Sequence, residues 1–251
     1  MLTDIDKSKF AEAKIKVLGE FSESGGIGTL AEKALHRILK YYIEPDESCH
    51  EVKILGSVAD VKNGEGIFEI QTRRLSALRP KLEKFLSEYK VTVIYPMPYE
   101  KHITLIDGES GEFISRRKSP KKSTAYDALY ELYNLKDLLG RENLSVAIML
   151  LNVDEYRYTG GRHFGRKSRS TRIERIPNSI EHVYLLNSPE DYKTLFTPDG
   201  LDEEFTAGAY GRAVSKSFKH GYSGVALLEA LGVLQSRKQG RIKLYKNKEN
   251  D

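Results

Sequence analysis

The chain has 251 residues, of which 30% are charged and 39% hydrophobic, and its formal net charge is +4. This balance is typical of a folded globular protein. The longest apolar run, Val146 to Leu151, is too short to cross a bilayer, and the first residues lack the apolar segment of a secretory signal. Cys49 is the single cysteine, which excludes an intrachain disulfide and a cysteine-rich zinc site. We therefore expect a cytoplasmic protein without membrane contact.

Helical and alternating hydrophobic patterns predict an α/β core in the first part of the chain. The expected elements are a helix at 29–43, a hairpin of strands 52–61 and 67–72, a helix at 75–89, a strand at 91–95 that ends at Pro96, a hairpin at 102–106 and 112–115, a helix at 123–139 and an apolar strand at 144–153. Elements in this order predict one mixed sheet flanked by helices.

The second part of the chain departs from this pattern. A basic segment at 159–176 is expected to be a linker or a loop. The elements expected beyond it are a strand at 182–186, helices at 189–196, 205–218 and 223–231, and a hairpin at 232–245 with a basic tip. Two short helices before such a hairpin resemble a winged-helix module. We therefore expect three parts: 1–158, 159–176 and 177–251.

The hairpin around Asn63 to Gly66 carries the most informative polar residues. With Gly64 and Glu65 as a two-residue loop, Asp60 lies directly across from Glu69, and Gln71 shares their face of the sheet. Two carboxylates held as cross-strand neighbours repel each other. A hard divalent cation between them would remove this repulsion. The pattern therefore predicts a metal site that cleaves phosphodiesters.

Asp60 and the string Glu69-Ile70-Gln71 resemble the motif of the PD-(D/E)XK nuclease superfamily, and the wider string resembles an uncharacterised bacterial domain family. The resemblance implies a restriction-endonuclease-like sheet and cleavage of nucleic acid, DNA more than RNA, with Mg²⁺ or Mn²⁺. Asp60, Glu69 and the backbone carbonyl of Ile70 would bind the metal. Gln71 stands where most members carry lysine, so it would orient water or a phosphate oxygen but supply no positive charge.

Three further residues are candidates to complete this site. Lys62 shares the polar face of Asp60 by strand parity and is expected to supply the missing positive charge. Lys81, from the next helix, is a weaker candidate for that role. Glu32, from the preceding helix, is expected to add a carboxylate.

Basic residues gather in three clusters, which suit a polyanion because each neutralised phosphate releases bound counterions. One cluster, Arg116 to Lys122, follows the second hairpin. The residues expected to contact nucleic acid come from the other two: Arg162, Arg166, Lys167, Arg169 and Arg172 in the basic segment, and Arg237, Lys238 and Arg241 in the C-terminal hairpin.

Two other functions stay open. The chain could be a catalytically decayed nucleic-acid-binding protein on the same fold, an alternative that Gln71 supports. It could also be a regulatory protein-interaction module whose winged helix forms the surface of a homodimer. A non-functional interpretation of the hairpin is a solvent-facing surface on which Asp60, Glu69 and Gln71 only increase solubility.

Overall fold

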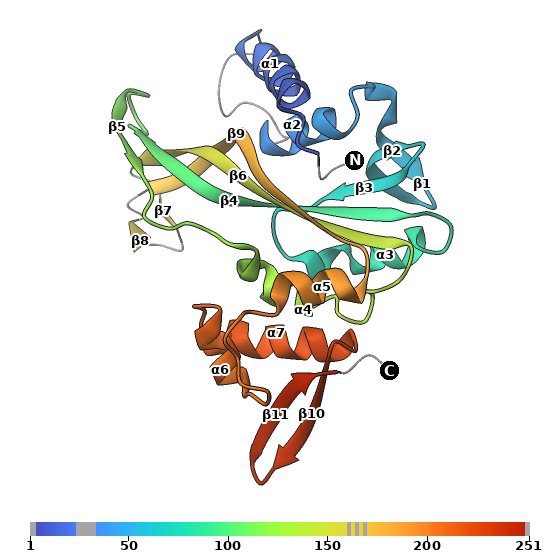
Figure 1. The fold of residues 1–251 in the computed structure, drawn as a ribbon. Helices are drawn as coiled ribbons and strands as arrows, with labels where there is room; N and C mark the ends of the chain where they lie inside the picture. The colour runs from blue at the N-terminus through green and yellow to red at the C-terminus, as the bar shows by residue number, and fades with distance from the viewer. Residues whose placement is uncertain (1–3, 24–33, 160–161, 164–165, 168–169, 249–251) are drawn as a thin grey trace. The chain divides into compact units, whose positions relative to one another are not determined.

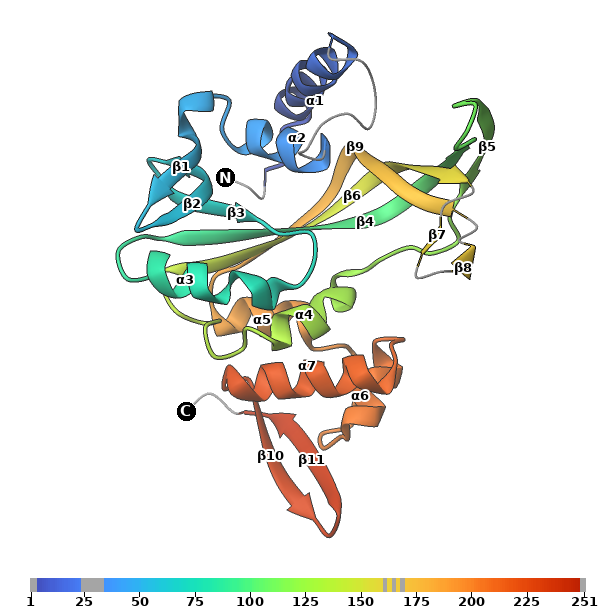
Figure 2. The same cartoon turned by 180° about the vertical axis from the view of Figure 1, so that it is seen from behind.

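A mixed β-sheet organises the chain. The computed structural model describes residues 4–23, 34–159, 162–163, 166–167 and 170–248 (Figure 1, Figure 2). The large sheet has the strand order β1-β2-β3-β4-β6-β9, and β5 pairs with β4. β2 runs antiparallel to β3, whereas β3 runs parallel to β4. The predicted α/β class, a mixed sheet flanked by helices with a small C-terminal sheet, is confirmed.

The strands of the large sheet are β1 (His50–Ile54), β2 (Ser57–Asn63), β3 (Gly66–Ile70), β4 (Val91–Ile106), β5 (Phe113–Lys118), β6 (Leu144–Thr159) and β9 (Ser170–Leu186). Two small hairpins are formed by β7 (Arg162–His163) with β8 (Arg166–Lys167), and by β10 (Leu234–Gln239) with β11 (Ile242–Asn247). The α-helices are α1 (Lys7–Glu23), α2 (Ala34–Ile43), α3 (Arg79–Phe85), α4 (Leu129–Tyr133), α5 (Pro189–Phe196), α6 (Ala207–Ala213) and α7 (Phe218–Ala230). Among the described residues, no helix has the length and apolar character needed to cross a membrane.

The chain divides into two compact units, each assembled from three segments. The first unit comprises Met1–His50, Pro96–Ser123 and Met149–Val183. The second unit comprises Glu51–Tyr95, Thr124–Ile148 and Tyr184–Asp251. These divisions differ from the expected parts 1–158, 159–176 and 177–251, because the long strands β4, β6 and β9 each contribute a segment to both units.

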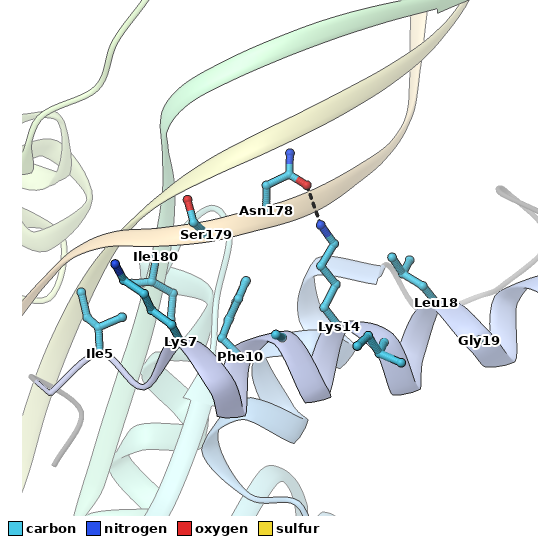
Figure 3. A pocket seen from close by; sticks show the side chains of 11 residues that line it. Ile5, Lys7, Phe10, Lys14, Leu18, Gly19, Asn178, Ser179 and Ile180 are labelled. Carbon is cyan, nitrogen blue, oxygen red and sulfur yellow. Dashed lines mark hydrogen bonds between the residues drawn. The ribbon is translucent and has the colours of Figure 1, made fainter.

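In the first unit, α1 and α2 pack against each other, with the rings of Phe10 and Tyr42 edge to face at 5.7 Å. α1 also lies along β9, where the Nζ atom of Lys14 donates to Oδ1 of Asn178 at 2.7 Å (Figure 3). A groove of about 780 Å³ follows this contact and has Ile180 and Phe10 in its apolar lining. The Lys14–Asn178 contact thus ties helix α1 to the sheet beside an apolar groove.

In the second unit, the helix predicted at 75–89 is split by Pro80. Leu75–Leu78 forms a 3-10 turn (η2), and α3 begins at Arg79, so that Pro80 lies in the first helical turn. Proline is tolerated there because the first backbone N–H groups of a helix have no intrahelical acceptor. Leu75 and Leu82 are fully buried, as the amphipathic pattern predicts.

The helix predicted at 123–139 is much shorter in the structure. A 3-10 turn (η3, Ala125–Ala128) leads into α4, which ends at Tyr133. The side-chain amide of Asn134 donates to the Tyr130 carbonyl at 2.8 Å, and its backbone N–H donates to the Glu131 carbonyl at 3.2 Å. Asparagine therefore competes for the carbonyl that the next helical turn would use, and the chain turns.

The strand predicted at 91–95 continues through Pro96 to Ile106 as β4, so its predicted end is wrong. The register explains why proline is tolerated. β3 pairs with β4 only as far as Ile70 opposite Ile94, and the Gln71 N–H donates to the Ile94 carbonyl. Pro96 therefore lies beyond this ladder, where its missing N–H interrupts none of the residue pairs between β3 and β4.

The segment expected to be a linker at 159–176 is largely strand. β9 already begins at Ser170, and Glu174 and Ile176 are buried within it. A basic strand can lie in the sheet because Arg175 pairs with Glu155 of β6 at 2.8 Å. Cross-strand charge pairing thus overrides the loop-like composition.

The C-terminal elements follow the order α5, an isolated β-bridge at Phe205, α6, α7 and the β10–β11 hairpin. Phe205 and Tyr245 exchange two backbone hydrogen bonds of 2.9 and 2.8 Å, which adds Phe205 to the edge of β11. The rings of Phe205 and Tyr210 stack at 6.3 Å, and the Tyr210 hydroxyl donates to the Phe196 carbonyl at 2.6 Å. The predicted hairpin is confirmed, with β10 antiparallel to β11 around Gly240 and Arg241.

Glycine is required where α6 crosses α7. A Cβ atom at Gly221 would lie 2.5 Å from the Ala207 carbonyl oxygen and 2.8 Å from the Gly211 Cα atom. We expect Gly221→Ala to lower the free energy of unfolding by about 1–3 kcal/mol through overpacking. Gly19→Ala in α1, where the added atom has no neighbour within 4 Å, should raise it by up to about 1 kcal/mol through helix propensity. Urea denaturation of both variants measures these changes in the free energy of unfolding. Equal changes in the two variants would contradict the close crossing of α6 and α7 at Gly221.

Candidate functional site

The β2–β3 hairpin sets the geometry of the candidate site in the second unit. Val61 pairs with Phe68 and Asn63 with Gly66, so the loop has the two predicted residues and Asp60 stands opposite Glu69. Gly66 has a φ of 139°, and a Cβ atom there would lie 2.5 Å from the Lys90 carbonyl oxygen. The glycine of the turn therefore lets the hairpin approach the chain that enters β4.

The two carboxylates hold each other's backbone where the paired stretch ends. Oδ2 of Asp60 accepts from the Ile70 N–H at 2.7 Å, and Oε1 of Glu69 accepts from the Asp60 N–H at 3.3 Å. This reciprocal exchange replaces the ladder that a regular hairpin would continue. Each carboxylate is positioned by the backbone of the other's strand, so the acidic pair is part of the hairpin architecture.

The burial of Glu69 contradicts the non-functional interpretation, in which the acidic pair lies on a solvent-facing surface. The side chain of Glu69 is 1% exposed, whereas Asp60 is partly exposed. The opposite face, with Val61 and Phe68, is buried as predicted. Burial, and after it the neighbouring charge of Asp60, raise the pKa of Glu69 to about 7 against the lowering effect of Lys81. Placing an ionisable group here is costly, and solubility does not require it.

Lys81 supplies the positive charge of the site. Its Nζ atom lies 2.5 Å from Oε2 of Glu69, and it reaches there from α3. The expected source, Lys62, instead donates to the Asn63 carbonyl at 2.7 Å and lies 5.5 Å from the centre of the Tyr89 ring. The lysine in contact with Glu69 is therefore Lys81, the weaker candidate from the sequence, because strand parity does not report which helical residue reaches the strand. A role for Lys62 stays a prediction.

Gln71 does not take part in the contacts between the carboxylates. Its Nε2 atom donates to the Arg73 carbonyl at 2.5 Å and lies 3.4 Å from the Arg74 carbonyl. Its side chain therefore fastens the turn after β3, and Arg74 in that turn has a φ of 51°. A role for Gln71 in orienting water stays a prediction.

The donor set fits a hard divalent cation in chemistry and falls short in number. Asp60 and Glu69 offer carboxylate oxygens in a half-buried position, and their mutual repulsion favours a cation between them. Within the described ranges, no three histidine, cysteine, aspartate or glutamate side chains gather as a metal cluster. Water and phosphate oxygens would have to complete the coordination, as is common for Mg²⁺. Glu32 lies outside the described residues, and the contribution of the Ile70 carbonyl stays a prediction.

The residues expected to contact nucleic acid are divided between the two units, with the basic segment in the first and the C-terminal hairpin in the second. Arg237 pairs with Glu204, with Nε 2.7 Å from Oε1, whereas Lys238 and Arg241 are exposed at the hairpin tip. Arg172 is half-buried in β9. The side chains of Arg162, Arg166 and Lys167, and the whole of Arg169, lie outside what the structure describes. Lys238 stands directly opposite Lys243, whose charge is balanced by Glu229 at 2.7 Å.

In the winged-helix module expected from the sequence, α7 would be the recognition helix, but it packs onto α4 of the same unit (Figure 1). The Nζ atom of Lys219 lies 3.6 Å from the centre of the Tyr130 ring, and the rings of Tyr222 and Tyr133 meet at 6.2 Å. This face of α7 is therefore occupied within the protein. Exposed cations of the module remain at the tip of the β10–β11 hairpin.

A family model described as a domain of unknown function (DUF8091) matches residues 33–187. The chain belongs to this family. The match includes the carboxylate hairpin, Lys81 and all of β9, and it ends before α5. An uncharacterized protein of Treponema pallidum (strain Nichols) is 33% identical over 233 residues, which cover 88% of this chain and 87% of the relative. No solved structure matches the chain.

The raised pKa of Glu69 predicts a dependence of stability on pH. In the unfolded chain this carboxyl has an ordinary pKa of 4.5, and in the folded protein its pKa is about 7. Between these values the folded state binds one more proton, so the free energy of unfolding falls as pH rises. In the presence of EDTA, Glu69→Gln should lose this fall. Relative to the unmodified protein, the variant should gain about 3 kcal/mol between pH 4.5 and pH 8.

Urea denaturation across this pH range measures the effect. Glu65→Gln, in the exposed hairpin turn, is the matched control and should show the same pH dependence as the unmodified protein. If Glu69→Gln also kept that dependence, the Glu69 carboxyl would be ionised throughout the range and its proposed environment would be incorrect.

Proposed function

We propose that this protein is a cytoplasmic, Mg²⁺- or Mn²⁺-dependent nuclease that hydrolyses phosphodiester bonds, in DNA more than in RNA. One observation carries the proposal: a buried glutamate at the start of Glu-x-Gln is flanked by a cross-strand aspartate and a helical lysine. Acid, acid and cation at one hairpin form the polar set required to hold a metal beside a phosphate.

Asp60 and Glu69 would hold the metal, and a bound metal would activate water and offset charge on the phosphate. The protein prepares these ligands before any metal arrives. Asp60 Oδ2 is fixed by the Ile70 N–H and Glu69 Oε1 by the Asp60 N–H, so neither carboxylate is free to turn away. Such preorganisation reduces the cost of rearrangement during reaction.

We propose that Lys81 compensates negative charge in two states of the site: on Glu69 without metal, and on a phosphate oxygen when substrate is bound. Without metal, its ammonium compensates the Glu69 carboxylate at 2.5 Å. An ammonium has three donors, so the contact with Glu69 leaves donors for a phosphate oxygen. Gln71 has no charge, and its amide is engaged with main-chain carbonyls. Lys81 therefore supplies the positive charge that a lysine at position 71 supplies in most members of the nuclease superfamily.

The alternative is a catalytically decayed nucleic-acid-binding protein, and the same ion pair supports it. Lys81 compensates Glu69 without any metal, so the acidic pair is stable as it stands. In this alternative, the hairpin is a structural remnant and binding depends on basic residues elsewhere. Cleavage assays separate the two functions.

We expect the purified protein to cleave DNA when Mg²⁺ or Mn²⁺ is added, and Asp60→Asn and Lys81→Met each to slow cleavage by about 100-fold or more. Gln71→Ala should lower the rate less than Asp60→Asn does, because in the described part of the chain its amide bonds the carbonyls of the following turn. Lys84→Met is the matched control for Lys81, since Lys84 is exposed on the same helix. Initial rates on labelled single-stranded and duplex DNA and on RNA measure these effects.

Absence of metal-dependent cleavage of every substrate would favour the decayed binder. Full activity of Asp60→Asn would place the chemistry elsewhere in the chain. A rate for Lys81→Met equal to that of Lys84→Met would remove the helical lysine from the mechanism while leaving the acidic pair in it.

A further inference from the structure

A second charged cluster lies in the first unit, on strands β4, β6 and β9. At its centre is Glu155 of β6, which is fully buried. Its carboxylate accepts from Nε of Arg157 at 2.7 Å and from Nε of Arg175 at 2.8 Å. The Nζ atom of Lys101 lies 3.6 Å from the same carboxylate. Neither the nuclease motif nor the basic clusters of the sequence pointed to Glu155 or Lys101.

The cluster is not balanced in charge. Three cations surround one carboxylate, and the neighbouring Glu174 accepts only from the backbone N–H of Arg175 at 2.7 Å among the contacts described. The three basic side chains keep some access to solvent, with exposed fractions of 17% for Lys101, 31% for Arg157 and 24% for Arg175. With Glu174 counted, three cations face two carboxylates, and an excess of one positive charge is held close to the surface.

The cluster also keeps hydrogen-bond donors in reserve. Arg175 uses its Nε atom on Glu155, and in the described part of the chain its two terminal nitrogens meet no acceptor within hydrogen-bond distance. The terminal nitrogens of a guanidinium match the spacing of phosphate oxygens. Glu155 thus orients the Arg175 fork without consuming it. The Arg157 fork is more fully engaged, with Nε and Nη2 on Glu155 and Nη1 at 3.3 Å from the Ser170 hydroxyl, so Arg157 contributes charge rather than free donors.

The lowered pKa of Lys101 indicates that Glu155 does not fully compensate the positive charge of the cluster. Burial lowers the pKa of Lys101 more than the Glu155 carboxylate raises it, and the two guanidinium groups lower it further. An anion bound at the cluster would offset these effects. Cations held together at such a cost are common where a polyanion binds.

We propose that Lys101, Arg157 and Arg175 form a binding site for a backbone phosphate of nucleic acid, with Glu155 as the residue that positions the two arginines. A polynucleotide suits this site better than a free phosphate ion for two reasons. The cations come from three neighbouring strands and are partly exposed on each. The chain between β6 and β9 is itself rich in arginine and lysine, which extends the basic character along the sequence.

Binding in EDTA tests this site without any cleavage, so its outcome is separate from that of the nuclease proposal. The probe is a fluorescently labelled single-stranded DNA of about 20 nucleotides, followed by anisotropy over a range of salt concentrations. We expect Lys101→Met to weaken binding about fivefold and to reduce the salt slope by about 0.7, as for one lost contact to a single strand. Glu155→Gln removes the negative charge that the three cations share but keeps an amide oxygen that can accept from an arginine, so we expect it to tighten binding.

Lys16→Met is the matched control, because Lys16 is a cation of the same unit that pairs with Glu47 at 2.6 Å, away from this cluster. It should leave the affinity and the salt slope nearly unchanged. Thermal unfolding of each variant shows that it is folded. If Glu155→Gln does not fold, Lys101→Met and its control still decide the test.

Equal affinities of Lys101→Met and the unmodified protein would overturn the proposal and leave a structural ion network. Weaker binding by Glu155→Gln, when that variant is folded, would also count against it. Inorganic phosphate tests the source of the ligand. If phosphate stabilises the unmodified protein but not Lys101→Met, while DNA binding is the same in both, the site belongs to free phosphate and the proposal fails.

Discussion

The candidate site depends on one constraint, which is that two carboxylates must face each other across a hairpin that is largely buried. Their repulsion and the burial of Glu69 would normally open such a turn. The protein meets this cost with hydrogen bonds from the backbone to both side chains and with the ammonium of Lys81. A two-residue loop fixes the register, and α3 brings the lysine. The hairpin, the helix and the acidic pair are therefore one structural solution.

The same principle operates with the opposite sign in the first unit. There a single buried carboxylate, Glu155, organises three cations, and the excess charge is positive. The C-terminal module adds a third arrangement, because α7 packs on α4 and Arg237 pairs with Glu204. The exposed cations of the module are thus fewer than its composition indicates. The second unit therefore holds excess negative charge, which a divalent cation would relieve, and the first unit holds excess positive charge, which a phosphate would relieve.

Local rules were sufficient to predict the hairpin and its acidic pair. A turn sequence and a period of two fix both the register and the face of Asp60 and Glu69. The same rules failed where distant segments decide. Lys81 reaches Glu69 because Pro80 sets where α3 begins, and strand parity carries no information on that. Basic composition alone predicted a loop around Arg175. The residue lies in a strand because Glu155 of another strand pairs with it, and the local sequence does not show that partner.

The central claim is that Asp60 and Glu69 form a metal site, and a crystal structure of the protein with Mn²⁺ tests it most directly. Anomalous scattering identifies manganese independently of any assumption about ligands. The account predicts an anomalous peak within coordination distance of carboxylate oxygens from both residues, at about 2.0–2.2 Å for a small divalent cation, with Lys81 displaced from or sharing Glu69. The account would be contradicted by crystals in which Mn²⁺ binds elsewhere but gives no anomalous peak beside Asp60 and Glu69, and in which the Lys81–Glu69 ion pair is intact.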